Sequence, residues 1–165
     1  MHETDEDFEA TQRLLDASWS RAGSHLKHIW GEETRLDARQ LSAELPGVQV
    51  LDLATVTPRC EPRVAPVDGF FFRGSFWFGS SPESTRFRNI RRNPAVSGSV
   101  TRGSETFLVL VHGVAVEEDR DRQEASGFAD YARATYDFDW DAAHPGAPYA
   151  WIDARTLLAF KREHA

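Results

Sequence analysis

Apolar residues in the first forty-five positions of the chain recur at roughly the spacing of an α-helix, with polar residues between them. The residues that carry this spacing are Phe8, Leu15, Trp19, Leu26 and Ile29. A break is expected at Gly31. A second helix is predicted where Asp37 can cap the first turn and Gln40 can reach back to it, and Pro46 follows its end. The segment 1–47 is therefore expected to form a helical N-terminal extension.

From Val48 onward the pattern changes to the alternation and β-branched content of strands. The expected extended segments are 48–57, 63–72, 75–79, 96–101, 106–116, and a tail in which 149–152 and 157–161 are joined by 153–156. Arg73 and Gly74 form a plausible two-residue turn, and a short helix is expected near Phe128 and Tyr136. These segments predict a mainly β protein with flanking helices: a six-stranded antiparallel split β-barrel over residues 48–165, in a single domain with the N-terminal extension.

Composition agrees with one soluble domain. The chain has 165 residues, of which 41% are hydrophobic and 27% charged, and it has no apolar run approaching a membrane span. The acidic start is unlike a signal peptide, and the lone cysteine, Cys60, fits a reducing compartment, so a cytoplasmic location is expected. The net charge of -7 argues against a nucleic-acid partner.

One segment opposes this acidic balance. Four arginines fall within seven positions, namely Arg86, Arg88, Arg91 and Arg92. Ser81 is expected to cap a helix here, with Pro82 in its first position and the hydroxyls of Ser84 and Thr85 in its first turn. Free N–H groups and guanidinium forks suit a phosphate monoester. The alternative is a solvated basic helix face.

The order of segments resembles the FMN-binding split barrel of the pyridoxamine 5'-phosphate oxidase-like flavoproteins. The likeness is carried by the strand 50–57, the turn and strand start at 62–67, the aromatic stretch 76–81, and the arginine-rich stretch 84–94 followed by Val96 and Ser97. The segment 151–160 is similar to the closing strand of that family.

The resemblance implies the residues of a cofactor site. The flavin phosphate would be bound by Arg63, Ser84, Thr85 and Arg86. The ring would lie against the backbone of Val64, Ala65 and Pro66, near Phe78, Gly79 and Ser80. It also implies a homodimer with the flavin at the subunit interface, where Phe107 and Trp151 are candidates to reach the partner's flavin. Both are equally good core residues.

The implied function is an oxidoreductase in which FMN carries a hydride to or from a small organic substrate, with no catalytic side chain assigned. A deazaflavin coenzyme on the same barrel is the alternative cofactor. The stretch 160–165 lacks the arginine and tryptophan motif with which genuine pyridoxamine-phosphate oxidases bind substrate. Two further hypotheses stay open: a flavin carrier or sensor without turnover, and a basic surface for an anionic partner without cofactor.

Other candidate chemistry is weak. His25 and His28 are expected at the surface because they lack further metal ligands, and no metal site is predicted. His112 is expected to be surface-facing or satisfied within its strand, and Cys60 to be an incidental thiol. The alternating acids Asp137, Asp139 and Asp141 lack the spacing of a calcium-binding loop and are interpreted as solvated.

Overall fold

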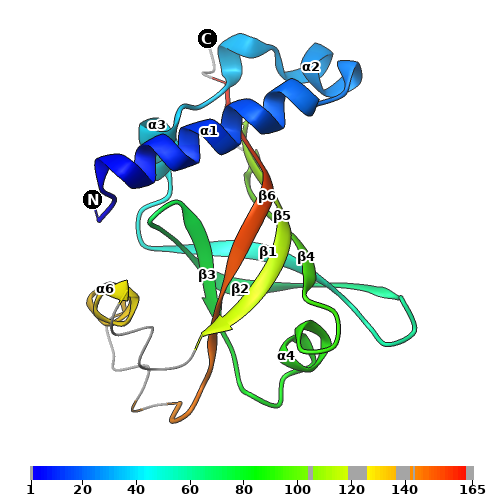
Figure 1. Ribbon diagram of the computed structural model, residues 1–165, viewed down its shortest axis with the longest axis vertical. Helices are drawn as coiled ribbons and strands as arrows, with labels where there is room; N and C mark the ends of the chain where they lie inside the picture. Colours follow the sequence, from blue (N-terminus) through cyan, green and yellow to red (C-terminus); the bar gives the residue numbers. More distant parts are fainter. Residues whose placement is uncertain (1, 104–105, 119–125, 137–141, 143, 163–165) are drawn as a thin grey trace.

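The computed structural model describes residues 2–103, 106–118, 126–136, 142 and 144–162. Its centre is a closed antiparallel barrel with the strand order β1-β2-β3-β6-β5-β4, as the alternation of the sequence predicts (Figure 1). The strands are β1 (Val48–Val56), β2 (Pro62–Phe72), β3 (Ser75–Gly79), β4 (Ala95–Arg102), β5 (Phe107–Glu118) and β6 (Tyr149–Lys161).

The barrel interior is filled by inward-pointing residues of the strands, and burial alternates most clearly along β1, β4 and the first half of β5. On β1, Leu51 and Leu53 are buried while Val50 between them is 66% exposed. Phe71, Phe76 and Val109 join the same core cluster. Because the side-chain period of a strand is two, this pattern fixes which face of every strand points inward.

The connection between β2 and β3 is the predicted two-residue turn. Phe72 pairs with Ser75, and the residues between them, Arg73 and Gly74, have φ angles of 47° and 77°. Two consecutive positive φ angles are typical of the type I′ turn, whose twist matches that of the flanking strands.

The C-terminal segment is a single last strand, as the sequence predicts. β6 runs without a break along β5, and its register shifts between His112 and Gly113, which pair with Thr156 and Ala154. Arg155 is therefore an extra residue, and such a bulge lets a strand bend while it stays paired.

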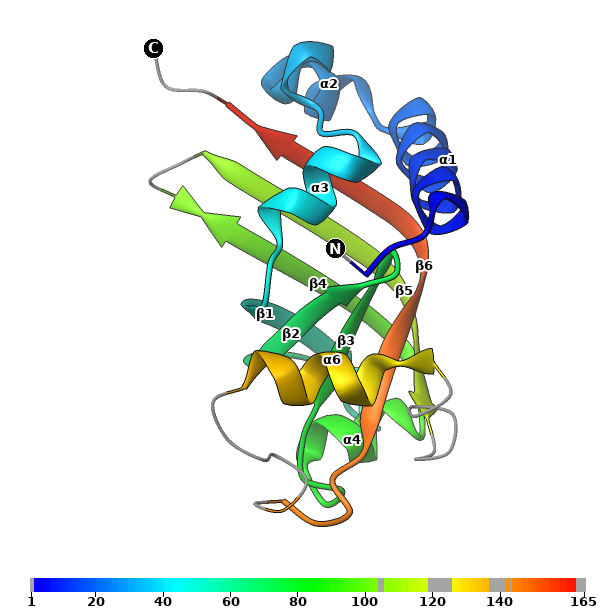
Figure 2. The ribbon, with the colours of Figure 1, turned by 90° about the vertical axis from the view of Figure 1, so that its left-hand side faces the viewer.

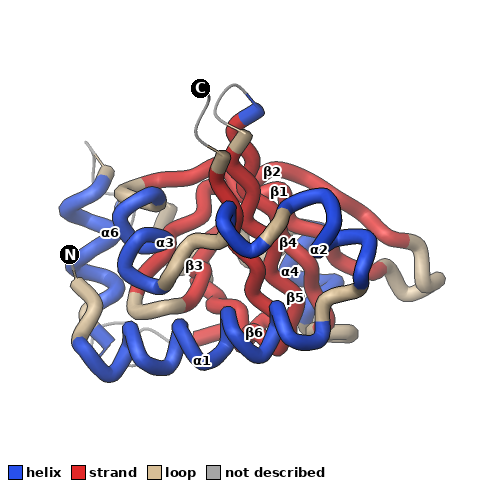
Figure 3. Tube along the Cα trace, turned by 90° about the horizontal axis from the view of Figure 1, so that it is seen from above, coloured by secondary structure: helices blue, strands red, loops and turns tan. Residues whose placement is uncertain are grey.

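Three helices and a short 3-10 turn precede the barrel: α1 (Asp5–Arg21), α2 (Ser24–Trp30), η1 (Glu32–Thr34) and α3 (Ala38–Glu44). They lie together at one end of the barrel, away from α4 (Figures 1 and 3). Asp37 caps α3 in a capping box with Gln40, as predicted, and the chain breaks at Gly31. A further break at Ala22 and Gly23 separates α1 from α2.

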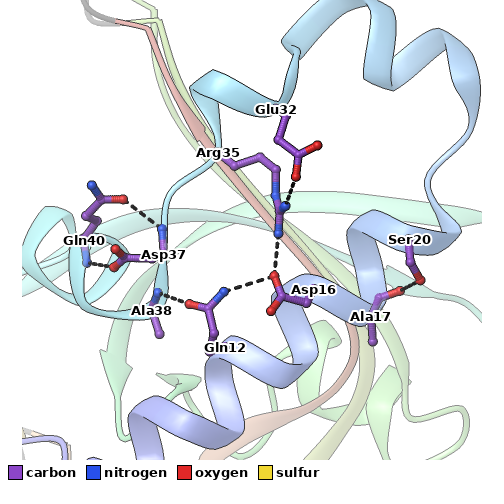
Figure 4. Close-up of polar contacts among 9 residues, drawn as sticks. All are labelled: Gln12, Asp16, Ala17, Ser20, Glu32, Arg35, Asp37, Ala38 and Gln40. Carbon is purple, nitrogen blue, oxygen red and sulfur yellow. Dashed lines mark hydrogen bonds and ion pairs between the residues drawn. The ribbon is translucent and has the colours of Figure 1, made fainter.

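Polar contacts hold the elements of this helical layer together (Figure 4), and one further hydrogen bond joins the layer to the barrel. Gln12 of α1 accepts a hydrogen bond from the backbone N–H of Ala38 at 2.9 Å. The guanidinium of Arg35 donates to the carboxylate of Glu32 at 2.9 Å and to that of Asp16 on α1 at 2.6 Å. The backbone N–H of Leu157 on β6 donates to the buried Ser18 hydroxyl at 3.0 Å. The layer is thus bonded to the barrel at interior positions of β6 and not only packed on it.

α6 (Phe128–Thr135) crosses the outer side of β2, β3 and β6 (Figure 2). Its Phe128 is fully buried and stacks on Trp77 with ring centroids 4.3 Å apart. Phe70, Phe72 and Tyr149 complete this second core cluster. Because aromatic side chains bury large areas, this cluster holds the short helix on the sheet.

The arginine-rich helix, α4 (Thr85–Ile90), begins later than the sequence suggests. Ser84, with extended backbone angles of φ -61° and ψ 147°, is its N-cap, and its hydroxyl accepts from the N–H of Phe87. Residues 81–84 instead form a turn in which the N–H of Ser84 donates to the carbonyl of Ser81 at 2.9 Å. The prediction of Ser81 as the cap is wrong because this turn delays the first helical residue to Thr85.

Candidate cofactor site

A pocket of about 570 Å³ lies between the β1–β2 hairpin and the start of α4. In Figures 1 and 3 this hairpin extends beyond the body of the barrel. The pocket is lined by Leu53, Thr55, Thr57, Arg63, Val64, Ala65, Ser84, Thr85 and Arg86. The fold therefore brings together six residues that the sequence assigned to a cofactor, from two segments about twenty positions apart. The volume is within the usual range for small-molecule sites.

Arg86 is the most unusual charge of the pocket. Burial lowers the pKa of its guanidinium, and its Nη2 donates to the carbonyl oxygen of Pro66 at 3.0 Å. Within the described part of the chain, no carboxylate lies at ion-pair distance from Arg86. A partly desolvated cation without a counter-ion costs free energy, so the pocket favours an anionic ligand.

Arg63 reaches the pocket from β2. It pairs across the sheet with Thr55 of β1 and contacts Glu61 at 3.2 Å. Both side chains of this ion pair are largely exposed, at 64% and 51%. Exposed pairs of this kind are weak, so the contact with Glu61 leaves Arg63 able to turn toward an anion.

The backbone of β2 offers an open surface beside these cations. Residues 62–66 are all exposed although they are paired with β1, and Val64 is 70% exposed. In a strand with one buried face, alternate residues would be covered. Here both faces are open, which leaves room for a ligand along one face and a second molecule along the other.

The remaining predicted residues lie elsewhere in the described chain. Phe78 is fully buried in the core against Phe87, and a Cβ at Gly79 would lie 2.8 Å from the ring of Tyr149. The N–H of Ser80 donates to the carbonyl of Pro148 at 3.4 Å. These three positions do not line the pocket between the hairpin and α4.

Phe107 and Trp151 are also separate from that pocket. Phe107 is 2% exposed in the barrel core, where the Arg102 guanidinium lies 4.5 Å from its ring centroid. Trp151 is partly buried near Trp77, and its Nε1 donates to Glu118 at 2.7 Å. Within one chain both therefore have packing roles, and their proposed reach to a partner's flavin stays a prediction.

Sequence reasoning missed the β1 wall of the pocket. Leu53, Thr55 and Thr57 alternate along the strand and share its inward face, so the period of two could have found them once Arg63 was placed opposite Thr55. It also missed Asn89, whose buried side chain on α4 donates to Thr55 at 3.0 Å.

The other arginines of the cluster have separate surroundings. Arg91 holds both carboxylate oxygens of Glu117 on β5, at 2.8 and 2.7 Å, and donates to the carbonyl of Pro82 at 2.9 Å. Arg88 donates to the Thr85 hydroxyl at 3.2 Å. Arg91 thus attaches the turn before α4 to the barrel, which makes its main role structural.

The weaker candidates are at the surface. His25, His28 and His112 are exposed, and His112 Nδ1 lies 2.9 Å from the Ser97 hydroxyl. No group of three or more metal-ligating side chains gathers among the described residues, and no helix there has the length and apolar character to cross a bilayer. Asp137, Asp139 and Asp141 lie outside the described residues.

The sequence itself matches no protein-family model and no curated protein. Several solved structures nevertheless have a backbone similar to that of this chain. A conserved hypothetical protein, Rv2991 from Mycobacterium tuberculosis, superposes with a TM-score of 0.66 at 19% identity, over 80% of this chain and 89% of that one. A putative pyridoxamine 5'-phosphate oxidase from Listeria innocua has a TM-score of 0.54 at 16% identity, over 67% and 87%. An F420 reductase has a TM-score of 0.53 at 20% identity, over 70% and 94%.

These likenesses extend over at least two thirds of this chain. At such low sequence identity, the similarity supports a shared backbone fold and does not identify a ligand. The chain therefore has the fold of the pyridoxamine 5'-phosphate oxidase-like split-barrel proteins.

Proposed function

We propose that this protein binds FMN with its phosphate in the pocket between the β1–β2 hairpin and α4, and that it acts as an oxidoreductase on a small organic substrate. The observation that carries the proposal is Arg86, a partly buried cation that has no carboxylate partner among the described residues. A ligand phosphate would supply the missing negative charge.

The side chains present fit this group. Arg63 offers a guanidinium from β2, and Ser84, Thr85 and Arg86 offer two hydroxyls and a second guanidinium from the start of α4. The exposed backbone of Val64, Ala65 and Pro66 suits the flat ring. A bound flavin accepts and returns a hydride itself, so the protein's task is to hold the ring, shield it and admit substrate.

A homodimer is part of the proposal. On the outer face of the hairpin, Val50 and Val64 are 66% and 70% exposed, and the cross-strand register places both on the side away from the barrel core. An apolar strand surface of this kind needs a cover. A second copy of the chain would cover this outer surface.

The chromophore is the first test. We expect the purified protein to be yellow, or to become so with added FMN, with absorbance in the flavin bands and FMN recovered by mass after gentle denaturation. Protein that stays colourless and does not bind added FMN would exclude this cofactor. Sedimentation of the wild type and of Val50→Glu, an exposed residue that does not line the pocket, with FMN titrated into each, tests whether dimerisation and binding are linked.

Deazaflavin coenzyme F420 is the second candidate, because an F420 reductase has the same fold. Titration with both coenzymes in parallel separates them by affinity. Turnover is tested by reducing the bound cofactor without oxygen and following its reoxidation by a panel of small organic acceptors. A cofactor that remains reduced with every acceptor would instead indicate a carrier or sensor.

A further inference from the structure

A buried hydrogen bond lies directly behind the pocket. Asn89 is on α4, one turn after Arg86, and is 3% exposed, while Thr55 on β1 is 4% exposed and lines the pocket. Asn89 Nδ2 donates to Thr55 Oγ1 at 3.0 Å. Asn89 itself does not line the pocket. Burying an amide costs free energy that a single hydrogen bond only partly offsets, so its position suggests a role in the site.

The direction of this hydrogen bond determines what Thr55 can offer a ligand. A hydroxyl has one hydrogen and can accept through its lone pairs. Because Thr55 Oγ1 accepts from Asn89, its own hydrogen must point away from Asn89. No other side-chain hydrogen bond of Thr55 occurs in the described part of the chain. The hydroxyl is therefore held as a donor at the pocket wall.

The other hydroxyls of the pocket are arranged in the same way. Thr57 Oγ1 accepts from the N–H groups of Arg59 and Glu61, at 3.3 and 3.1 Å. Ser84 Oγ accepts from the N–H of Phe87 at 3.2 Å, and Thr85 Oγ1 accepts from Arg88 at 3.2 Å. Each oxygen already receives an N–H, so each hydroxyl hydrogen remains available to an acceptor in the pocket.

We propose that Asn89 is a positioning residue for phosphate binding: its amide fixes the Thr55 hydroxyl as a donor to a phosphate oxygen, in a pocket whose hydroxyls all present hydrogens. This inference rests on the proposed FMN site. A fully deprotonated phosphate has only acceptors, so it matches such a wall, whereas a neutral polyol lacks that match. Asn89 acts only through Thr55 and makes no contact with the ligand.

The experiment compares FMN with riboflavin, which lacks the phosphate. The ratio of their dissociation constants isolates the phosphate contribution from ring binding and from losses of folded protein. We expect Thr55→Val to reduce the preference for FMN roughly tenfold or more, as for one hydrogen bond to a charged group. Thr55→Ser, which keeps the hydroxyl, should restore it. Asn89→Leu should also reduce the preference, by less than Thr55→Val.

The double variant decides between positioning and a purely structural role. In a Thr55→Val background, Asn89→Leu should change the FMN preference no further, because its effect passes through the hydroxyl. Asn89→Ala, which also removes the amide and adds no charge, serves as a second variant should the leucine variant not fold. Ser18→Ala, which removes a buried hydroxyl that accepts from Leu157 far from the pocket, is the matched control and should leave the preference unchanged.

Two results would overturn the inference: an unaltered FMN preference in Asn89→Leu or Asn89→Ala, or equal losses for either variant with and without the Thr55 hydroxyl. Either would make Asn89 an anchor of α4 only. Failure of the wild type to distinguish FMN from riboflavin would instead refute the phosphate site itself, so the two failures are distinguishable.

Discussion

Arg86 donates a hydrogen bond of 3.0 Å from its Nη2 to the carbonyl oxygen of Pro66, and this contact aligns the first turn of α4 with the exposed part of β2. It uses one N–H of the guanidinium and leaves others for a ligand. The two segments that form the pocket are thus held together by the same side chain that is proposed to bind the anion.

Replacing Arg86 by alanine should weaken FMN binding by about 1.5 to 3 kcal/mol, the scale of a hydrogen bond to a charged group. Fluorescence titration with FMN measures it. Arg92→Ala removes the same charge from an exposed position near the end of α4 and is the control. Equal affinities for wild type and Arg86→Ala would refute the phosphate assignment.

Arg91→Ala should affect stability more than binding. The hydrogen bond and charge of Glu117 raise the pKa of the Arg91 guanidinium, and both side chains are partly exposed, so the pair is worth about 0.2 to 1 kcal/mol. Urea unfolding of Arg91→Ala, of Glu117→Gln and of the double variant gives the interaction free energy between the two side chains. An FMN affinity lowered as far as in Arg86→Ala would contradict the structural role.

Tyr136 predicts a loss of stability at alkaline pH. Burial raises the pKa of Tyr136 above its ordinary value, and its hydroxyl donates to Asp68 at 3.1 Å. Because the folded state holds this proton more tightly, the stabilisation is complete below the unfolded pKa of about 10 and is lost as the pH rises toward the folded pKa. Tyr136→Phe should make the unfolding free energy depend less on pH above about 10, measured by urea unfolding at a series of pH values. An unchanged slope would contradict this.

Glu44 links the helical layer to the barrel. Its carboxylate accepts from Lys161 at 2.6 Å and from Arg102 at 3.3 Å, and its side chain is 24% exposed. Glu44→Gln should lower the free energy of unfolding by about 1.5 to 3 kcal/mol, the range for hydrogen bonds to charged groups. Glu9→Gln, which breaks an exposed pair with Arg13, should have almost no effect. Similar losses in both variants would argue against this link.

Cys60 lies in the turn between β1 and β2 with a φ of 60°, a conformation that suits glycine better than other residues. Cys60→Gly should therefore raise the free energy of unfolding by about 0.5 to 1 kcal/mol, while Cys60→Ala should leave it nearly unchanged. Thermal unfolding of the two variants in reducing buffer checks this. A less stable glycine variant would show that the thiol packs usefully in the turn.

Local pattern was sufficient for most of the fold. Alternation located the strands, and the residues Arg73, Gly74 and Asp37 located a turn and a cap, because each depends on neighbours in sequence. The tail was predicted as one last strand, but its bulge was not, because the extra residue Arg155 interrupts the alternation without interrupting the pairing.

The site was predictable only in part. Arg63, Ser84, Thr85 and Arg86 carry recognisable chemistry at the positions that the resemblance implied. Thr55 and Asn89 do not, because their contact joins residues 34 positions apart and depends on how α4 docks on β1. Such a contact depends on tertiary packing, and the spacing of residues within a single helix or strand does not predict it.

The barrel is closed between β1 and β4 by only three residue pairs, Asp52–Ser99, Leu53–Gly98 and Ala54–Ser97. Beyond them β1 continues to Val56 beside the pocket, paired with β2 alone. Amide protons along this short seam should exchange with solvent earlier than those of β5 and β6, which share a long ladder. A ligand bound by both the β1–β2 hairpin and α4 would add contacts next to the short β1–β4 pairing without being part of it. Cofactor loading would then slow exchange there first.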